Sequence, residues 1–135
     1  MHKGFLKTGA ALGALSVILG AFAAHNLKGK LASDVYAIFQ TAVQYQFLHV
    51  FAILLTAILY KEFPSKNIVW AGRFFVAGII LFSGSLYGLT YIKAIGSDMT
   101  WIGVITPLGG AAFIAGWLCL LYAFLKKPAP KTPYS

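Results

Sequence analysis

Four long runs without a charged side chain alternate with short polar stretches along this chain of 135 residues. The runs are Thr8–Leu27, Val35–Tyr60, Phe74–Ile92 and Gly103–Leu125, each 19 residues or longer. A helix needs about 20 apolar residues to cross the hydrocarbon core of a bilayer. The pattern therefore predicts an all-α fold, an integral membrane four-helix bundle.

Capping residues and breakers refine the expected boundaries. We expect a transmembrane domain over 1–127, with helices at about 5–24, 39–60, 74–92 and 107–125. Ser33 and Asp34 are suitable N-caps, so the second helix is also consistent with a start near residue 34. Thr106 is a suitable N-cap for the fourth helix and Pro107 a suitable first residue. The proline-rich residues 128–135 are expected to form a disordered cytoplasmic tail.

The first run also resembles a secretory signal peptide, because Lys3 and Lys7 precede it and Ala21-Phe22-Ala23 ends it. Its 20 uncharged residues are long for the apolar core of a signal peptide, where about 7–15 are usual. Removing it would also leave three helices and place the termini on opposite sides. We therefore interpret 5–24 as the first membrane helix.

The charge distribution fits a membrane protein. Charged residues make up 10% of the chain, against about 25% in soluble domains. The net charge of +8 lies at helix ends and forms no basic stripe typical of nucleic-acid binding, so we expect no nucleic-acid partner. One side holds Lys3, Lys7, Lys61, Lys66, Arg73, Lys126, Lys127 and Lys131, and the other Lys28, Lys30 and Lys93. This excess predicts a multi-pass protein of the cell (inner) membrane with both termini cytoplasmic.

Small residues recur at helical spacing and predict close helix packing. We expect the glycine face of the first helix to pack against the third or fourth helix. In the third helix, the Gly84-x-x-x-Gly88 pair is expected to make the tightest contact. The candidate packing residues are Gly9, Gly13, Gly20, Gly84, Gly88, Pro107, Gly109 and Gly116.

Polar residues within the apolar runs are the candidates for function, because polar groups in a bilayer need partners. In the second helix, Thr41, Tyr45, His49 and Thr56 share one face, which we expect to point into the bundle. His25 and His49, with nearby Gln44, are compatible with metal, haem or proton handling. Their different depths and the lack of further ligands favour hydrogen-bonded structural histidines, so we expect no metal and no cofactor. His49 is expected to bond a hydroxyl or carbonyl of a neighbouring helix, near Ser83 or Ser85.

Ser83, Ser85 and Thr106 add hydroxyls to the candidate set. A catalytic serine needs a base and an oxyanion site, whereas the acidic residues Asp34, Glu62 and Asp98 lie outside the predicted spans. We therefore predict no catalytic residue and no enzyme.

Four ordered segments carry a family resemblance: GAFAAHNLKGKL, TAVQYQFLHVFAILL, FSGSLYGL and ITPLGGAAFIAGWL. They resemble the small bacterial four-helix membrane proteins of the domain of unknown function 423 family, a UPF-type uncharacterised family related to eukaryotic transmembrane protein 256. The family's first motif usually has glycine where this chain has Ala23. The resemblance implies an inner-membrane protein of unassigned biochemistry and supplies no catalytic residue.

Two classes of function follow from these observations. The first is a structural, interaction or lipid-binding bundle that forms a homo-oligomer within the lipid bilayer. The alternative is an oligomeric channel or transporter that uses the polar face of the second helix. Anionic lipid headgroups are a further possible partner, near Lys28, Lys30, Lys93 and the start of the fourth helix.

Overall fold

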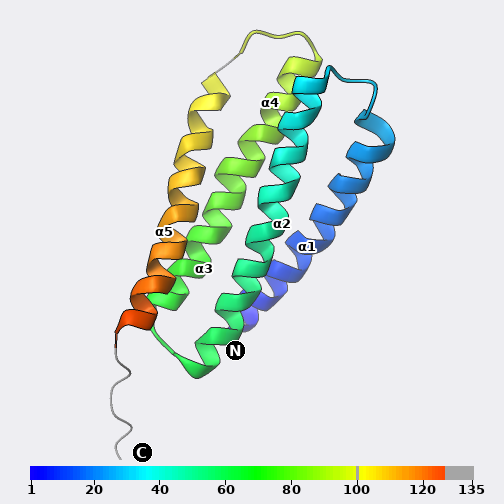
Figure 1. Ribbon diagram of the computed structural model, residues 1–135. Coiled ribbons are helices and arrows are strands. Elements are labelled where there is room, and N and C mark those ends of the chain that lie inside the picture. The colour runs from blue at the N-terminus through cyan, green and yellow to red at the C-terminus, as the bar shows by residue number, and fades with distance from the viewer. Residues whose placement is uncertain (100, 127–135) are drawn as a thin grey trace, which may run out of the picture.

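The computed structural model describes residues 1–99 and 101–126, and they form four long helical segments side by side (Figure 1). No strand occurs in this part of the chain, and all four segments are long and apolar enough to cross a membrane. The expected all-α membrane bundle is confirmed. The first segment is α1 (Lys3–Phe22) with the π-helix η1 (Ala23–Leu27), and the second is α2 (Ser33–Glu62). The third consists of α3 (Lys66–Gly78), the π-helix η2 (Ile79–Ser83) and α4 (Gly84–Ala94). The fourth consists of the 3₁₀ turn η3 (Trp101–Val104) and α5 (Ile105–Leu125).

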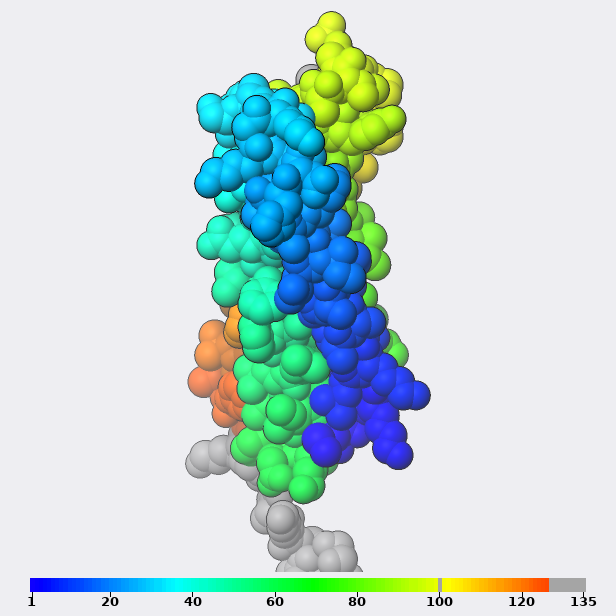
Figure 2. Space-filling model, turned by 90° about the vertical axis from the view of Figure 1, so that its right-hand side faces the viewer, coloured from blue at the N-terminus to red at the C-terminus, as the bar shows by residue number. Residues whose placement is uncertain are grey.

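The helix α2 has packing partners on several sides. It contacts α1 along one face, and α3, η2 and α4 along another. The helix α5 packs chiefly along α3 and η2, so α1 and α5 lie at opposite edges of the view in Figure 1. Figure 2 shows α1 running obliquely across α2. In an apolar 18-residue stretch of the α1–η1 segment only 11% of the residues are buried within the protein, against 44% in such a stretch of α2.

The helices extend beyond several predicted boundaries. The third segment begins at Lys66 and not near residue 74, and the Ser65 hydroxyl accepts from the Ile68 N–H at its start. The charge-free run did not include these first two turns, because they carry Lys66 and Arg73; long cationic side chains fit on a helix whose end reaches the headgroup layer. The second helix begins at Ser33, close to the earlier of the two expected starts. The expected tail, 128–135, lies outside the described residues.

The start of α5 also differs from the prediction. The turn η3 leads directly into α5 at Ile105, and Val104 occupies the N-cap position without a side-chain bond. Thr106 is therefore not the N-cap. Pro107 is the third helical residue, where its missing N–H still costs no helical hydrogen bond, because the first four N–H groups have no partner within a helix.

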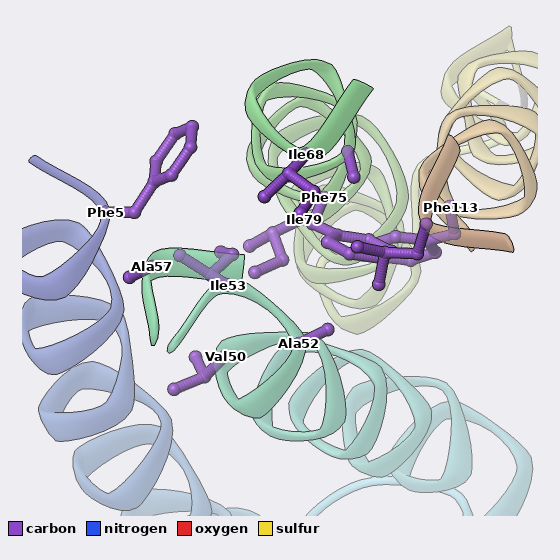
Figure 3. Close-up of a cluster of buried hydrophobic side chains, with 11 residues drawn as sticks. Phe5, Val50, Ala52, Ile53, Ala57, Ile68, Phe75, Ile79 and Phe113 are labelled. Carbon is purple, nitrogen blue, oxygen red and sulfur yellow. The ribbon is translucent and has the colours of Figure 1, made fainter. Parts of the chain in front are cut away.

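The buried apolar core lies between α2, α3 and α5, with Phe5 entering from α1 (Figure 3). One contact in this core is reciprocal: a Cβ at Gly78 of α3 would collide with Phe113 of α5. Conversely, a Cβ at Gly116 of α5 would lie 2.6 Å from the Phe75 ring of α3. Each helix thus inserts a phenylalanine over a glycine of the other, which brings the two backbones close together.

The glycine face of α1 has a different partner from the predicted one. A Cβ at Gly9 would lie 2.6 Å from Leu54, one at Gly13 3.3 Å from Val50, and one at Gly20 3.6 Å from Val43. All three partners belong to α2, so the expected packing against the third or fourth helix is wrong. Helices joined by a short loop usually pack as neighbours, and this rule prevails here.

The expected tight contact at Gly84-x-x-x-Gly88 is also wrong. A Cβ at Gly84 would meet nothing within 4 Å, and one at Gly88 would lie at ordinary contact distance, 3.5 Å, from Ile102. The closest glycine contact is at Gly109 of α5, where a Cβ would collide with the backbone of Phe82 in η2.

Candidate functional site

His49 lies in the middle of α2, 6% exposed, within a group of aromatic side chains. Its ring stacks on Phe113 with centroids 3.6 Å apart and planes 9° from parallel. The Nδ1 atom lies 2.8 Å from the Tyr45 carbonyl oxygen, and the Trp117 indole Nε1–H donates to Nε2 at 3.3 Å. Since a carbonyl only accepts and an indole N–H only donates, Nδ1 carries the proton and Nε2 is the acceptor.

This geometry uses both ring nitrogens for structural hydrogen bonds. The Tyr45 carbonyl belongs to the same helix as His49, α2, whereas Trp117 belongs to α5. The expected bond to a hydroxyl or carbonyl near Ser83 or Ser85 is therefore wrong. No group of three or more metal-ligating side chains occurs among residues 1–99 and 101–126. In its present position the ring has no free lone pair to offer a ligand.

Gln46 is a buried polar residue that the sequence analysis missed. Its side chain is 1% exposed, donates to the Leu12 carbonyl of α1 at 3.1 Å, and accepts from the Tyr87 hydroxyl of α4 at 2.7 Å. One amide therefore joins three helices. The only sequence signal for it was an amide within an apolar run, and Gln44 carries the same signal.

The hydroxyls of the candidate set also bind within the bundle. Ser83 donates to the Ala42 carbonyl of α2 at 2.7 Å. Ser85 and Thr106 hydroxyls lie 2.7 Å apart and join α4 to α5. Thr41 donates to a carbonyl one turn earlier on its own helix. In the described part of the chain, no buried side-chain nitrogen or oxygen lacks a partner, so these hydroxyls act as structural links.

Three candidates lie at the surface and not in the interior. His25, in η1, is exposed. Gln44 is exposed too, and Gln40, one turn earlier, is exposed beside it. Tyr45, which was expected to point into the bundle, is 39% exposed, so this expectation is wrong for Tyr45, although its ring lies 4.6 Å from the Phe82 ring. The polar residues of α2 therefore divide between an inward set around His49 and an outward pair of amides.

The outward amides border a groove between α1 and α2. It has a volume of about 520 Å³. The small residues Gly20 of α1 and Ala23 and Ala24 of η1 form one wall, whereas Gln40 and Gln44 contribute to the α2 wall. The small residues of one wall leave room for another backbone to approach, and the two glutamines of the other wall offer it hydrogen-bonding groups.

Comparison with known proteins identifies relatives along most of the chain. Residues 19–110 match the family described as protein of unknown function DUF423. The UPF0382 membrane protein SAB0533 of Staphylococcus aureus (strain bovine RF122 / ET3-1) is 40% identical over 126 residues, which cover 92% of this chain and 97% of the relative. The UPF0382 membrane protein YwdK of Bacillus subtilis (strain 168) is 38% identical over 125 residues, 92% of this chain and 98% of the relative. No solved structure matches the chain.

These relatives are named as membrane proteins, in agreement with the four apolar spans. The match extends over nearly the whole length of both chains and includes all four helices. The chain therefore belongs to the DUF423 family of UPF0382 membrane proteins.

Proposed function

We propose that this protein is a structural membrane protein that pairs with a second copy of itself through the α1–α2 groove. The observation that supports this proposal is the exposure of Gln40 and Gln44 beside a wall of small residues. A rise of about 1.5 Å per residue makes the 30-residue α2 about 45 Å long. Centred on a hydrocarbon core of about 30 Å, it places Gln44 about 9 Å below the core surface.

An amide at that depth loses its hydrogen bonds to water and gains none from lipid tails. Most soluble homodimers are two-fold symmetric, and the same geometry would bring the same patch of two copies face to face. A glutamine side chain both donates and accepts, so it is complementary to its own copy. The small residues of α1 allow the backbones to approach closely enough for these bonds.

The channel alternative has less support. A pore lined by Thr41, Tyr45, His49 and Thr56 needs these side chains to face water. His49 and Thr56 are buried, and Thr56 donates to the Ile53 carbonyl at 2.6 Å. The proposal also assigns no reaction to the chain, because each buried hydroxyl that would serve as a nucleophile already donates within the bundle.

The proposal includes the cell membrane as location, with both termini in the cytoplasm. Its support is the count of eight basic residues on the side of the termini against three on the other side.

The dimer is tested by energy transfer between donor- and acceptor-labelled protein in phosphatidylcholine vesicles, at decreasing protein density. Energy transfer should exceed the level expected for randomly placed molecules. It should fall to that level as the protein is diluted in the bilayer, with a midpoint that gives the dissociation constant of the dimer. Gln44→Leu removes two symmetric hydrogen bonds of about 0.6 kcal/mol each, which weakens dimerisation about eightfold. Gln44→Asn, which keeps an amide, should fall between this variant and the wild type.

Random-level transfer at every density would refute pairing. A dimer of unchanged affinity in Gln44→Leu would refute this groove as the interface.

A further inference from the structure

A second hollow lies where α2 ends and α3 begins, at the opposite end of the bundle from η1 (Figure 1). Its volume is about 410 Å³. Tyr60 of α2 contributes one wall, and Lys66, Trp70 and Arg73 of α3 contribute the other. None of these residues takes part in the α1–α2 groove, so the two surfaces are independent.

The hollow is positively charged. Lys66 and Arg73 are seven residues apart, which is about two helical turns, so they lie on the same face of α3. Both side chains are exposed, and no carboxylate is among the residues that line the hollow. Any neutralising charge for this pair must therefore come from outside the lining.

Arg73 has the greater need of a neutralising anion, because it lies deeper in the bilayer than Lys66. The third span, Lys66–Ala94, has 29 residues and is about 43 Å long. Centred on a core of about 30 Å, it places Arg73 about 4 Å below the core surface and Lys66 above it. A guanidinium at that depth is costly unless it reaches back to the headgroups or pairs with an anion.

The side chain of Arg73 points back toward the interface. Its guanidinium carbon lies 5.1 Å from the centre of the Trp70 ring, and Trp70 is one turn closer to the start of α3. Tryptophan is enriched at this level of the bilayer. The stacked pair therefore keeps the guanidinium near the edge of the hydrocarbon core, within reach of the headgroups.

We infer that this hollow binds the headgroup of an anionic phospholipid. The Arg73 guanidinium donates to the phosphodiester oxygens, for which its planar fork is well suited. The Lys66 ammonium neutralises the remaining negative charge in the headgroup layer. Tyr60, a half-buried residue that lines the hollow, supplies a neutral hydroxyl donor.

A comparable hollow for a control experiment lies at the other end of the bundle. A hollow of about 320 Å³ there includes Lys93, but its lining also includes the carboxylate of Asp98. The local charge is balanced, so this hollow offers no net attraction for an anion. Lys93 is thus a control for the general effect of removing one cation.

The test is native mass spectrometry of the full-length protein with phosphatidylglycerol and phosphatidylcholine of equal chain length. The wild type should retain phosphatidylglycerol in preference. Because each basic residue near a membrane surface contributes about fivefold to anionic lipid binding, Lys66→Gln and Arg73→Gln should each lower the preference about fivefold. Lys93→Gln should change it less than twofold. Arg73→Lys, which keeps the charge and loses the fork, should lower it by a smaller factor than Arg73→Gln.

Competition with inorganic phosphate decides the source of the anion. Millimolar inorganic phosphate should not displace phosphatidylglycerol; complete displacement would identify a site for free phosphate and overturn the inference. Equal retention of both lipids by the wild type would overturn it too, as would an unchanged preference in Lys66→Gln and Arg73→Gln proteins. If Arg73→Gln failed to fold, Arg73→Lys and Lys66→Gln would still decide the outcome.

Discussion

Replacing Gln46 with leucine tests the hydrogen-bonded bridge that joins three helices. The substitution keeps nearly the same volume and removes the amide that contacts Leu12 and Tyr87. The Leu12 carbonyl retains the Ser16 hydroxyl as a partner at 2.8 Å. The Tyr87 hydroxyl, in contrast, loses the acceptor on which it depends. The main loss therefore falls on the link between α2 and α4.

The expected loss of stability in Gln46→Leu follows from the two hydrogen bonds that the Gln46 side chain makes with Leu12 and Tyr87. Interhelical hydrogen bonds in membrane proteins contribute about 0.6 kcal/mol on average and up to about 1.7 kcal/mol. Losing both, with one hydroxyl left unpaired, should lower the free energy of unfolding by about 1–3 kcal/mol. Tyr87→Phe removes only the donor and should cost about 0.6–1.7 kcal/mol. The double variant should cost less than the sum of the two single variants.

The assay is unfolding by sodium dodecyl sulfate in mixed micelles, followed by tryptophan fluorescence at protein densities where the chain is monomeric. Gln44→Leu is the matched control, because it removes an exposed amide two residues away on the same helix. It should leave monomer stability within about 0.5 kcal/mol. The bridge would be refuted if Gln46→Leu were as stable as the wild type, or if the two substitutions were strictly additive.

Further variants test helix packing, the histidine and the topology. Gly109→Ala should lower the free energy of unfolding by about 2 kcal/mol or more, because its Cβ would collide with the backbone of η2; Gly84→Ala, in open space, should be neutral or stabilising by up to about 1 kcal/mol in the same assay. His49→Leu should destabilise the bundle by about 1–3 kcal/mol, since it leaves the Trp117 indole unpaired, and His49→Gln should retain more of the stability. Stoichiometric metal or haem in the wild type, absent from His49→Gln, would contradict the structural role. A reporter fused after Ser135 should be active only when it is a cytoplasmic reporter; activity of an exported reporter would contradict the orientation.

The number of membrane helices and their approximate positions along the chain were predictable from the sequence, because charge-free runs of this length have few other structural explanations. The inward face of α2 was harder to predict. This helix has partners on several sides, so no single stripe separates interior from lipid. Gln44 and Gln46 differ by two positions, and only the placement of the neighbouring helices decides which amide is buried.

The π-helix η2 interrupts the helical period of the third segment directly before Gly84. A 3.6-residue period extended through the third segment places Gly84 and Gly88 on the face that continues from Ala77. A π turn inserts an additional residue and rotates the positions that follow it. Ala77, before η2, is half-buried, whereas Gly84, after it, is exposed and faces open space. No feature of IILFS distinguishes a π turn from an α turn, so this shift was not predictable from the sequence.

Cysteine cross-linking in the membrane tests the proposed pairing most directly. Val17 and Ile18 are adjacent on α1 and equally exposed, at 62% and 63%, but only Val17 lines the groove. With the single native cysteine replaced by Cys119→Ala, Val17→Cys should form a disulfide-linked dimer on mild oxidation, and Ile18→Cys should form no disulfide-linked dimer. Equal cross-linking at the two positions, or cross-linking of Ile18→Cys alone, would contradict the groove as the interface.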